Sequence, residues 1–243
     1  MKKYLFLTLS ITILLTSCNK LVERVKSKFS DAFKSSLNIN PKDYYYSLSD
    51  LKESKVYVFK KIKKDVADYQ YIKAELRTDS LIKFTVYSHE KFEIEYFFER
   101  FHKDASYLVY HRMLEAKNPE TWAKCNIVDS LSFSFIPKEP GINIQTDFKL
   151  KLEKNFMYRV KNKTNDAALE KMIYNGDTLK VLVLSDDHKD LLINTTTSKQ
   201  TLFYESSRKL YFAKGIGLVK RIENKDGRII EYILDDIISE EDF

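Results

Sequence analysis

From residue 50 onward, the chain consists of short runs rich in Val, Ile, Tyr and Phe, separated by polar groups too short to hold a helix. The first runs cover 55–61, 69–77, 80–88, 91–101 and 106–114. In the fourth run, apolar residues alternate with Glu93, Glu95 and Glu99, which indicates a half-buried strand with one face in water. Strands this closely spaced leave no room for crossover helices, so we expect an antiparallel meander.

The second half of the chain resumes this pattern between less regular segments. Further strands are expected at 130–136, 147–152, 156–161, 178–184, 201–205, 210–222 and 228–234. We interpret 115–127 as a loop or short helix, 166–172 as a short helix, and 235–242 as a frayed acidic tail. The sequence therefore predicts one all-β domain over 44–243, with about twelve antiparallel strands forming an open curved half-barrel or two packed sheets.

Composition excludes several other classes of protein. Of 243 residues, 31% are charged and only 5 are Gly and 4 are Pro, which excludes a disordered chain, a collagen and a polytopic membrane protein. Two cysteines, Cys18 and Cys125, are too few for a disulfide scaffold. We expect Cys125, which has no intrachain partner, to be buried and inert.

Residues 1–17 have the features of a secretory signal peptide. Lys2 and Lys3 precede an uncharged, apolar run over 4–16. As a helix this run covers about 20 Å, less than the roughly 30 Å of a bilayer's hydrocarbon core, which favours a signal peptide over a membrane span.

The end of this segment, Leu15-Thr16-Ser17-Cys18, resembles the lipobox of bacterial lipoproteins. The resemblance implies cleavage before Cys18 and lipidation of its thiol and new amine, with palmitate among the acyl groups, so that the mature chain is anchored to a membrane. The alternative is that Cys18 merely follows an ordinary cleavage site. Asn19, where an inner-membrane lipoprotein tends to carry Asp, implies an outer-membrane protein. No acidic run follows Cys18, which favours the side of that membrane that faces the periplasm.

Residues 18–43 are expected to form the lipid anchor, an amphipathic helix and a linker. Over 20–36, apolar residues recur at steps of three and four, and the other faces are mostly basic. Such a helix can lie on an anionic bilayer surface, but packing against the domain is the favoured interpretation. Pro41 marks the end of this region.

The segment from Tyr211 to Lys220, YFAKGIGLVK, resembles one in secreted or lipid-anchored bacterial β-proteins of the TapB-like and DUF3108-like groups. The resemblance extends over 201–236 and implies no enzymatic activity. Gly215 and Gly217 argue for a bulge or a close approach of another backbone, and Gly227 for a hairpin turn at 224–227. A phosphate-binding loop is disfavoured, because 218–222 reads as a strand rather than a helix.

No motif in the sequence points to catalysis, a metal or a cofactor. His89, His102, His111 and His188 lie outside any metal-binding spacing. Asp186-Asp187-His188, with Asp190 close behind, offers oxygen ligands for a cation, although a solvated turn is the favoured interpretation. Nucleic-acid binding is also disfavoured, since Tyr and Phe at period two are typical of a β core.

Three triplets resemble the Asp-[Ser/Thr]-aliphatic acceptor of bacterial protein O-glycosylation. They place the modified hydroxyls at Ser80, Ser130 and Thr178. The alternative is structural, because Asp closes a turn and Ser or Thr begins the following strand.

These observations favour a non-enzymatic cell-envelope lipoprotein that binds an apolar ligand or a partner protein on its sheet. The predicted strand 55–61 carries apolar residues on both faces, more than one face of a sheet needs. The alternatives are a structural or assembly component without a pocket, and a hydrolase with an unrecognised site. A lined cavity favours a ligand, a flat aromatic patch a partner, and a cleft with a perturbed His or carboxylate an enzyme.

Overall fold

The computed structural model describes residues 39–62, 68–115, 118–149 and 155–243. The predicted signal peptide, Cys18 and the predicted helix over 20–36 lie outside these residues. Within the described ranges, no helix is both long enough and apolar enough to cross a membrane.

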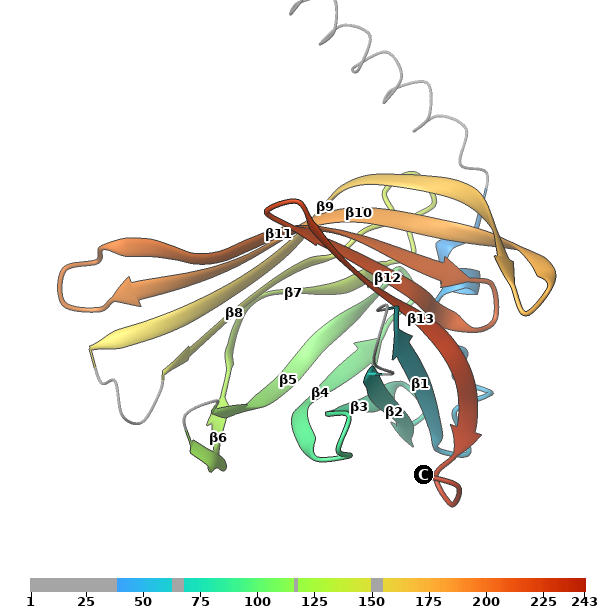
Figure 1. Ribbon diagram of the computed structural model, residues 1–243, viewed down its shortest axis with the longest axis horizontal. Helices are drawn as coiled ribbons and strands as arrows, with labels where there is room; N and C mark the ends of the chain where they lie inside the picture. The colour runs from blue at the N-terminus through green and yellow to red at the C-terminus, as the bar shows by residue number, and fades with distance from the viewer. Residues whose placement is uncertain (1–38, 63–67, 116–117, 150–154) are drawn as a thin grey trace, which may run out of the picture. The chain divides into compact units, whose positions relative to one another are not determined.

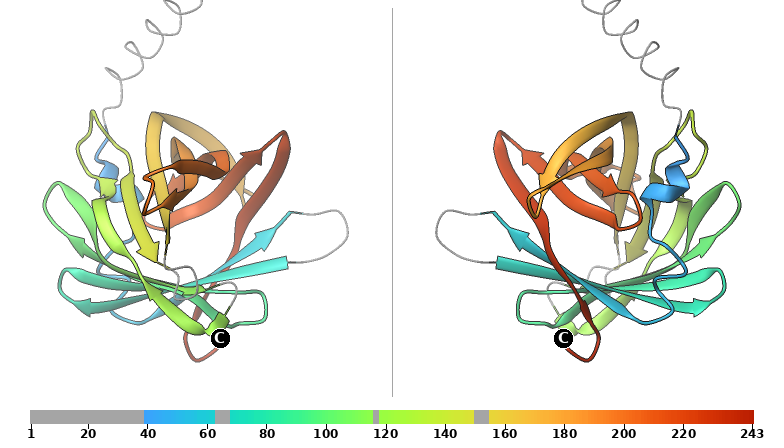
Figure 2. Two further views of the ribbon diagram at one scale, coloured as in Figure 1. Left: turned by 90° about the vertical axis from the view of Figure 1, so that its left-hand side faces the viewer. Right: turned by 90° about the vertical axis from the view of Figure 1, so that its right-hand side faces the viewer.

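The described strands form one antiparallel sheet that closes on itself (Figures 1 and 2). A short 3-10 helix, η1 (Pro41–Tyr44), precedes them. The strands are β1 (Lys55–Lys61), β2 (Asp68–Thr78), β3 (Leu81–Tyr87), β4 (Glu93–Phe101), β5 (Ala105–Glu115), β6 (Asn118–Lys124), β7 (Asn126–Ser134), β8 (Asn143–Lys149), β9 (Phe156–Tyr174), β10 (Asp177–Asn194), β11 (Gln200–Ala213), β12 (Gly217–Lys225) and β13 (Arg228–Ser239). Around the ring they follow chain order, except that β6 pairs with β5 outside it.

The predicted antiparallel meander is confirmed, but the predicted open half-barrel is wrong because β1 pairs with β13. Their register runs from Lys55 opposite Ser239 to Lys61 opposite Tyr232. Four of the seven pairs use residues 236–239, which lie in the predicted frayed tail. The chain end beyond them is also packed, with the ring of Phe243 5.1 Å from that of Tyr71.

Four other local predictions are wrong, two of them because β9 and β10 form one long hairpin. Residues 166–172 lie in β9 rather than in a helix, and 185–190 lie in β10 rather than in a turn. The register of the pair shifts between Ser185 and Asp186, which is a bulge. The predicted loop or short helix over 115–127 contains β6, and the predicted strand over 210–222 is interrupted by a turn at 214–216.

An aromatic plug, which we define as Tyr44, Tyr45 and Tyr46, fills one end of the barrel. All three residues are buried. The ring of Tyr45 lies 4.6 Å from that of Phe133, and the ring of Tyr46 lies 5.0 Å from that of Phe84. These contacts belong to a core of large apolar side chains, so this end of the barrel is solid.

The plug requires a glycine on β12. Gly217 has φ +95°, and a Cβ atom at this position would lie 2.8 Å from two ring carbons of Tyr46. Gly215 and Gly227 also have positive φ, but a Cβ atom at either would have no neighbour within 4 Å. Gly217 therefore provides space for a side chain, whereas the other two serve turns.

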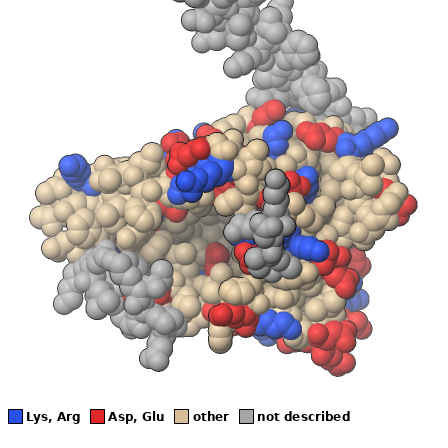
Figure 3. All heavy atoms as spheres, viewed as in Figure 1, with Lys and Arg blue, Asp and Glu red and all other residues tan. Residues whose placement is uncertain are grey.

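β9 and β11 extend past their outer neighbours. β8 pairs with β9 only as far as Lys163, and β12 pairs with β11 only from Ser207 onward. Figure 1 shows the joined ends of β10 and β11 projecting to one side. Figure 3 shows few charged side chains on the projecting part, whereas acidic and basic side chains are interspersed elsewhere on this face.

Candidate ligand-binding cavity

A cavity of about 470 Å³ lies inside the barrel. Its walls are the inward faces of β2 to β5 and of β8 to β12, where every second residue points inward. The lining consists of Gln70, Ile72, Val86, Glu95, Phe97, Glu99, Leu108, His111, Met113, Ile144, Thr146, Val160, Asn162, His188, Asp190, Arg208 and Arg221. The cavity is therefore amphipathic.

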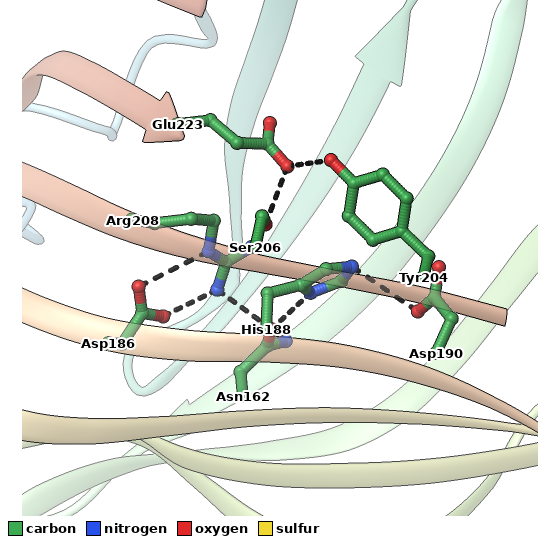
Figure 4. A network of polar contacts seen from close by, with 8 residues as sticks. All are labelled: Asn162, Asp186, His188, Asp190, Tyr204, Ser206, Arg208 and Glu223. Atoms are coloured by element: carbon green, nitrogen blue, oxygen red, sulfur yellow. Dashed lines mark hydrogen bonds and ion pairs between the residues drawn. The ribbon is translucent and has the colours of Figure 1, made fainter. Parts of the chain in front are cut away.

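The strand register brings the polar side chains of β9, β10 and β11 together (Figure 4). Asp186 lies opposite Arg208, and His188 lies opposite both Asn162 and Ser206. Arg208 binds the Asp186 carboxylate through Nε at 3.2 Å and Nη2 at 2.5 Å. The Asp186 side chain is fully buried, so this bidentate pair neutralises both charges inside the protein.

Hydrogen bonding fixes the orientation of His188. Oδ1 of Asn162 accepts from Nη2 of Arg208 at 2.7 Å, and it lies 2.6 Å from Nδ1 of His188. Because this oxygen can only accept, Nδ1 of His188 is the donor. Nε2 of the same ring then faces a carboxylate oxygen of Asp190 at 3.2 Å.

Glu223, on β12, lies beside Tyr204 and Ser206 of β11 (Figure 4). It accepts hydrogen bonds from the hydroxyls of Tyr204 and Ser206, the latter at 2.8 Å. Burial acts to raise the pKa of Glu223, but these two donors and the charges of Arg221 and Arg208 lower it below its ordinary value. Glu223 is therefore a stable carboxylate.

Arg221 differs from the other interior charges. Its Nη2 donates to Oε1 of Gln70 at 3.0 Å, and its guanidinium lies 4.5 Å from the ring centre of Tyr232. Among the described residues it forms no ion pair within 4.0 Å, and its buried Nε has no hydrogen-bond partner. Burial lowers the pKa of Arg221 below its ordinary value. Arg208 adds to this effect, while Tyr232 and the more distant carboxylates of Glu223 and Glu95 only partly oppose it.

A second polar group lies on β4 and β5. Nε2 of His111 lies 2.8 Å from a carboxylate oxygen of Glu95. Burial acts to lower the pKa of His111, but the neighbouring side chains of Cys125 and Glu95 raise it to about 10. His111 is therefore protonated at neutral pH.

Glu99 connects the cavity to the aromatic plug. One of its carboxylate oxygens accepts from the hydroxyl of Tyr45 at 2.5 Å and from that of Ser106 at 2.7 Å. Burial raises the pKa of Glu99 above its ordinary value, and these hydrogen bonds only partly offset this effect. Glu99, which lines the cavity, is thus anchored to the plug through Tyr45.

Of the residues that the sequence pointed to, some lie in the cavity and others lie elsewhere. His89 and His102 lie outside the cavity, and the described part of the chain holds no cluster of side chains suited to a metal ion. Asp186 and His188 belong to the cavity network rather than to a solvated turn. Cys125 is buried, as predicted. Ser80 lies in the turn before β3, Ser130 within β7, and Thr178 near the start of β10, where its side chain is exposed.

Sequence reasoning missed Arg208, Arg221, Asn162 and the inward role of Glu95. The predicted wet face of β4 is the barrel interior, where Glu95 and Glu99 line the cavity. The available signal was a charged residue at every second position of strands that also carry apolar residues. In an open sheet, this pattern indicates a face that is exposed to solvent.

The fold and the cavity together define a class: a closed antiparallel barrel, filled at one end by aromatic side chains, that encloses an amphipathic cavity. No protein-family profile and no curated protein sequence matches the chain.

Two solved structures resemble the model at low sequence identity. One is described as a candidate lipoprotein from Parabacteroides distasonis ATCC 8503, with 7% identity and a TM-score of 0.48 over 80% of this chain and 98% of that one. The other is described as a candidate exported protein with a YmcC-like fold from Bacteroides fragilis NCTC 9343, with 9% identity and a TM-score of 0.43 over 77% of this chain and 96% of that one.

Proposed function

We propose that this protein is a non-enzymatic lipoprotein of the bacterial envelope that holds a small amphipathic molecule inside its barrel. The observation that carries the proposal is the cavity of about 470 Å³. Its volume lies within the roughly 300–1,000 Å³ of known ligand sites, and its wall combines apolar side chains with a few fixed polar groups. The ligand therefore binds within the barrel rather than on an open sheet face.

The arrangement of the polar groups supports binding rather than catalysis. Asp186, Glu95 and Glu99 are each held by a cation or by hydroxyl donors within the protein. Such fixed pairs orient a ligand without offering a free base. His111, with a pKa of about 10, already carries the proton that a general base would have to accept at neutral pH.

Binding can be tested with octan-1-ol as an uncharged amphipathic probe, by isothermal titration calorimetry on the full chain. Val160 lines the cavity, so Val160→Trp is expected to occupy part of it and weaken binding. The matched control is Lys161→Trp, because the next residue of a strand points to the opposite face. Absence of binding to the wild-type chain, or equal binding by Val160→Trp and the wild-type chain, would contradict the proposal.

The envelope location rests on the lipobox-like segment that ends at Cys18. We propose lipidation of Cys18, with the protein on the outer membrane facing the periplasm. Mass spectrometry of the amino-terminal peptide is expected to show a diacylglyceryl thioether and an acylated amine. In fractionated cells, Cys18→Ala is expected to leave the membrane pellet; retention of the variant there at the wild-type level would refute the anchor.

One observation favours a second candidate function, a thiol-dependent hydrolase. The backbone N–H of Cys125 donates to the carbonyl of His111 at 3.0 Å, and Nε2 of His111 lies 2.8 Å from Glu95, so a nucleophile, an imidazole and a carboxylate are neighbours. A protonated His111 would stabilise a thiolate. The Cys125 side chain is buried, which limits access to it. Hydrolysis of p-nitrophenyl esters that is lost in Cys125→Ser would favour this function over simple binding.

A further inference from the structure

We propose that the ligand of the cavity carries a single carboxylate group and that Arg221 binds it. This inference rests on the ligand-binding function proposed above and specifies the chemical class of the ligand.

Most of the charged side chains that face the cavity already have a partner within the protein. Arg208 is paired with Asp186, which lies behind it. His111 lies against Glu95, and His188 lies against Asp190. Glu99 is held by the hydroxyls of Tyr45 and Ser106. Of the described groups that line the cavity, Arg221 is thus the cation without a carboxylate partner within 4.0 Å.

The guanidinium of Arg221 has a hydrogen-bond donor without an acceptor. A guanidinium has five N–H donors, which match a carboxylate in a two-point arrangement. Gln70 accepts one of these hydrogens, and the buried Nε–H has no acceptor in the described part of the protein. A buried donor without an acceptor is destabilising, so a bound carboxylate would remove a defect as well as supply the missing negative charge.

Apolar side chains of β2 and β3 lie beside Arg221 and can contact the rest of the ligand. Arg221 reaches from β12 to Gln70 on β2, and Ile72 is the next inward residue of β2. Val86 lies opposite Ile72 in the register of β2 and β3, and it also lines the cavity. An apolar wall therefore begins beside the guanidinium. A carboxylate on Arg221 would place a hydrocarbon chain against this wall, which is the geometry of a fatty-acid-like molecule.

A single unpaired cation also limits the charge of the ligand. A dianionic phosphate would bring one negative charge more than Arg221 neutralises, into a cavity that the carboxylates of Glu95 and Asp190 also line. A cationic ligand that bound beside Arg221 would be repelled by the guanidinium. A monoanion is the ligand that completes the existing pairs.

The inference can be tested by calorimetry of the full chain with three probes of equal chain length: octanoate, octan-1-ol and octylammonium. We expect the wild-type chain to bind octanoate roughly 10- to 100-fold more tightly than octan-1-ol, the size expected for a hydrogen bond to a charged group. Arg221→Gln is expected to abolish this preference while retaining octan-1-ol binding. Lys220→Gln, which removes a charge from the next residue of β12, is expected to retain the preference.

The other outcomes of these titrations contradict either the carboxylate assignment or the proposed function. Equal binding of octanoate and octan-1-ol by the wild-type chain, tighter binding of octylammonium, or an unchanged preference in Arg221→Gln overturns the carboxylate assignment and leaves the proposed function intact. Failure of all three probes to bind overturns the proposed function itself.

A measurement on the wild-type chain covers the case in which Arg221→Gln does not fold. Octanoate labelled with ¹³C at its carboxyl group can be titrated by NMR while bound. A carboxyl pKa below that of free octanoate supports an adjacent cation, and a value equal to or above it overturns the assignment.

Discussion

Substitution of Gly217 by Ala tests whether the aromatic plug determines the residue at this position. At φ +95° an L-residue is strained by about 1–2 kcal/mol. The new methyl group would also lie 2.8 Å from two ring carbons of Tyr46, and overpacking of this kind costs about 1–3 kcal/mol. We therefore expect Gly217→Ala to lower the free energy of unfolding by about 2–5 kcal/mol in urea titrations.

Gly215→Ala is the matched control for backbone strain. Gly215 has φ +74° but no atom within 4 Å of its added Cβ, so only the strain of about 1–2 kcal/mol applies. The difference between the two variants measures the contact with Tyr46, and Tyr46→Ala should remove that difference in a double-mutant cycle. Equal losses in Gly217→Ala and Gly215→Ala, or a difference that survives Tyr46→Ala, would refute the reasoning.

Three further predictions concern the interior polar groups, each measured by urea unfolding. Asp186→Ala leaves the Arg208 guanidinium buried and unpaired, so we expect a loss of about 3–5 kcal/mol, and a loss below 1 kcal/mol would contradict the pairing. The folded pKa of His111, about 10, exceeds its ordinary value of 6.5, so its stabilising contribution is complete below pH 6.5 and is lost as the pH rises through 10; His111→Gln should remove this decline. Tyr45→Phe removes a donor to the buried carboxylate of Glu99 and should cost about 1–3 kcal/mol; a neutral effect would show that water replaces the hydroxyl.

The antiparallel meander could be predicted from the sequence because local alternation and short spacing determine it. β1 at Lys55–Lys61 matches its predicted range, since its run of apolar residues is bounded by polar ones. Closure could not be predicted, because it depends on residues far apart in the chain. Asp236 pairs opposite Val58 across β13 and β1, yet an acidic segment at a chain end reads as solvated.

The candidate site was inaccessible to sequence reasoning for a related reason. Asn162, Asp186 and Arg208 meet only through the registers of β9 with β10 and of β10 with β11. The sequence shows Asp186 in a polar run with Asp187 and His188, but nothing in it brings Asn162 and Arg208 to that run. Arg221 was equally hidden, because a charged residue inside an apolar strand indicates an exposed face unless the sheet is known to close around it.

The extension of β11 past β12 has a consequence for how copies of this protein meet. From Gln200 to Ser206, the described structure pairs no strand with the β12 side of β11, and Leu202 and Phe203 are exposed beside this edge. Unpaired backbone next to exposed apolar side chains is a template for strand addition. Self-association at high concentration, or capture of an extended peptide from a partner protein, would therefore begin at this edge, and a proline substituted at Leu202 would block it by removing a donor.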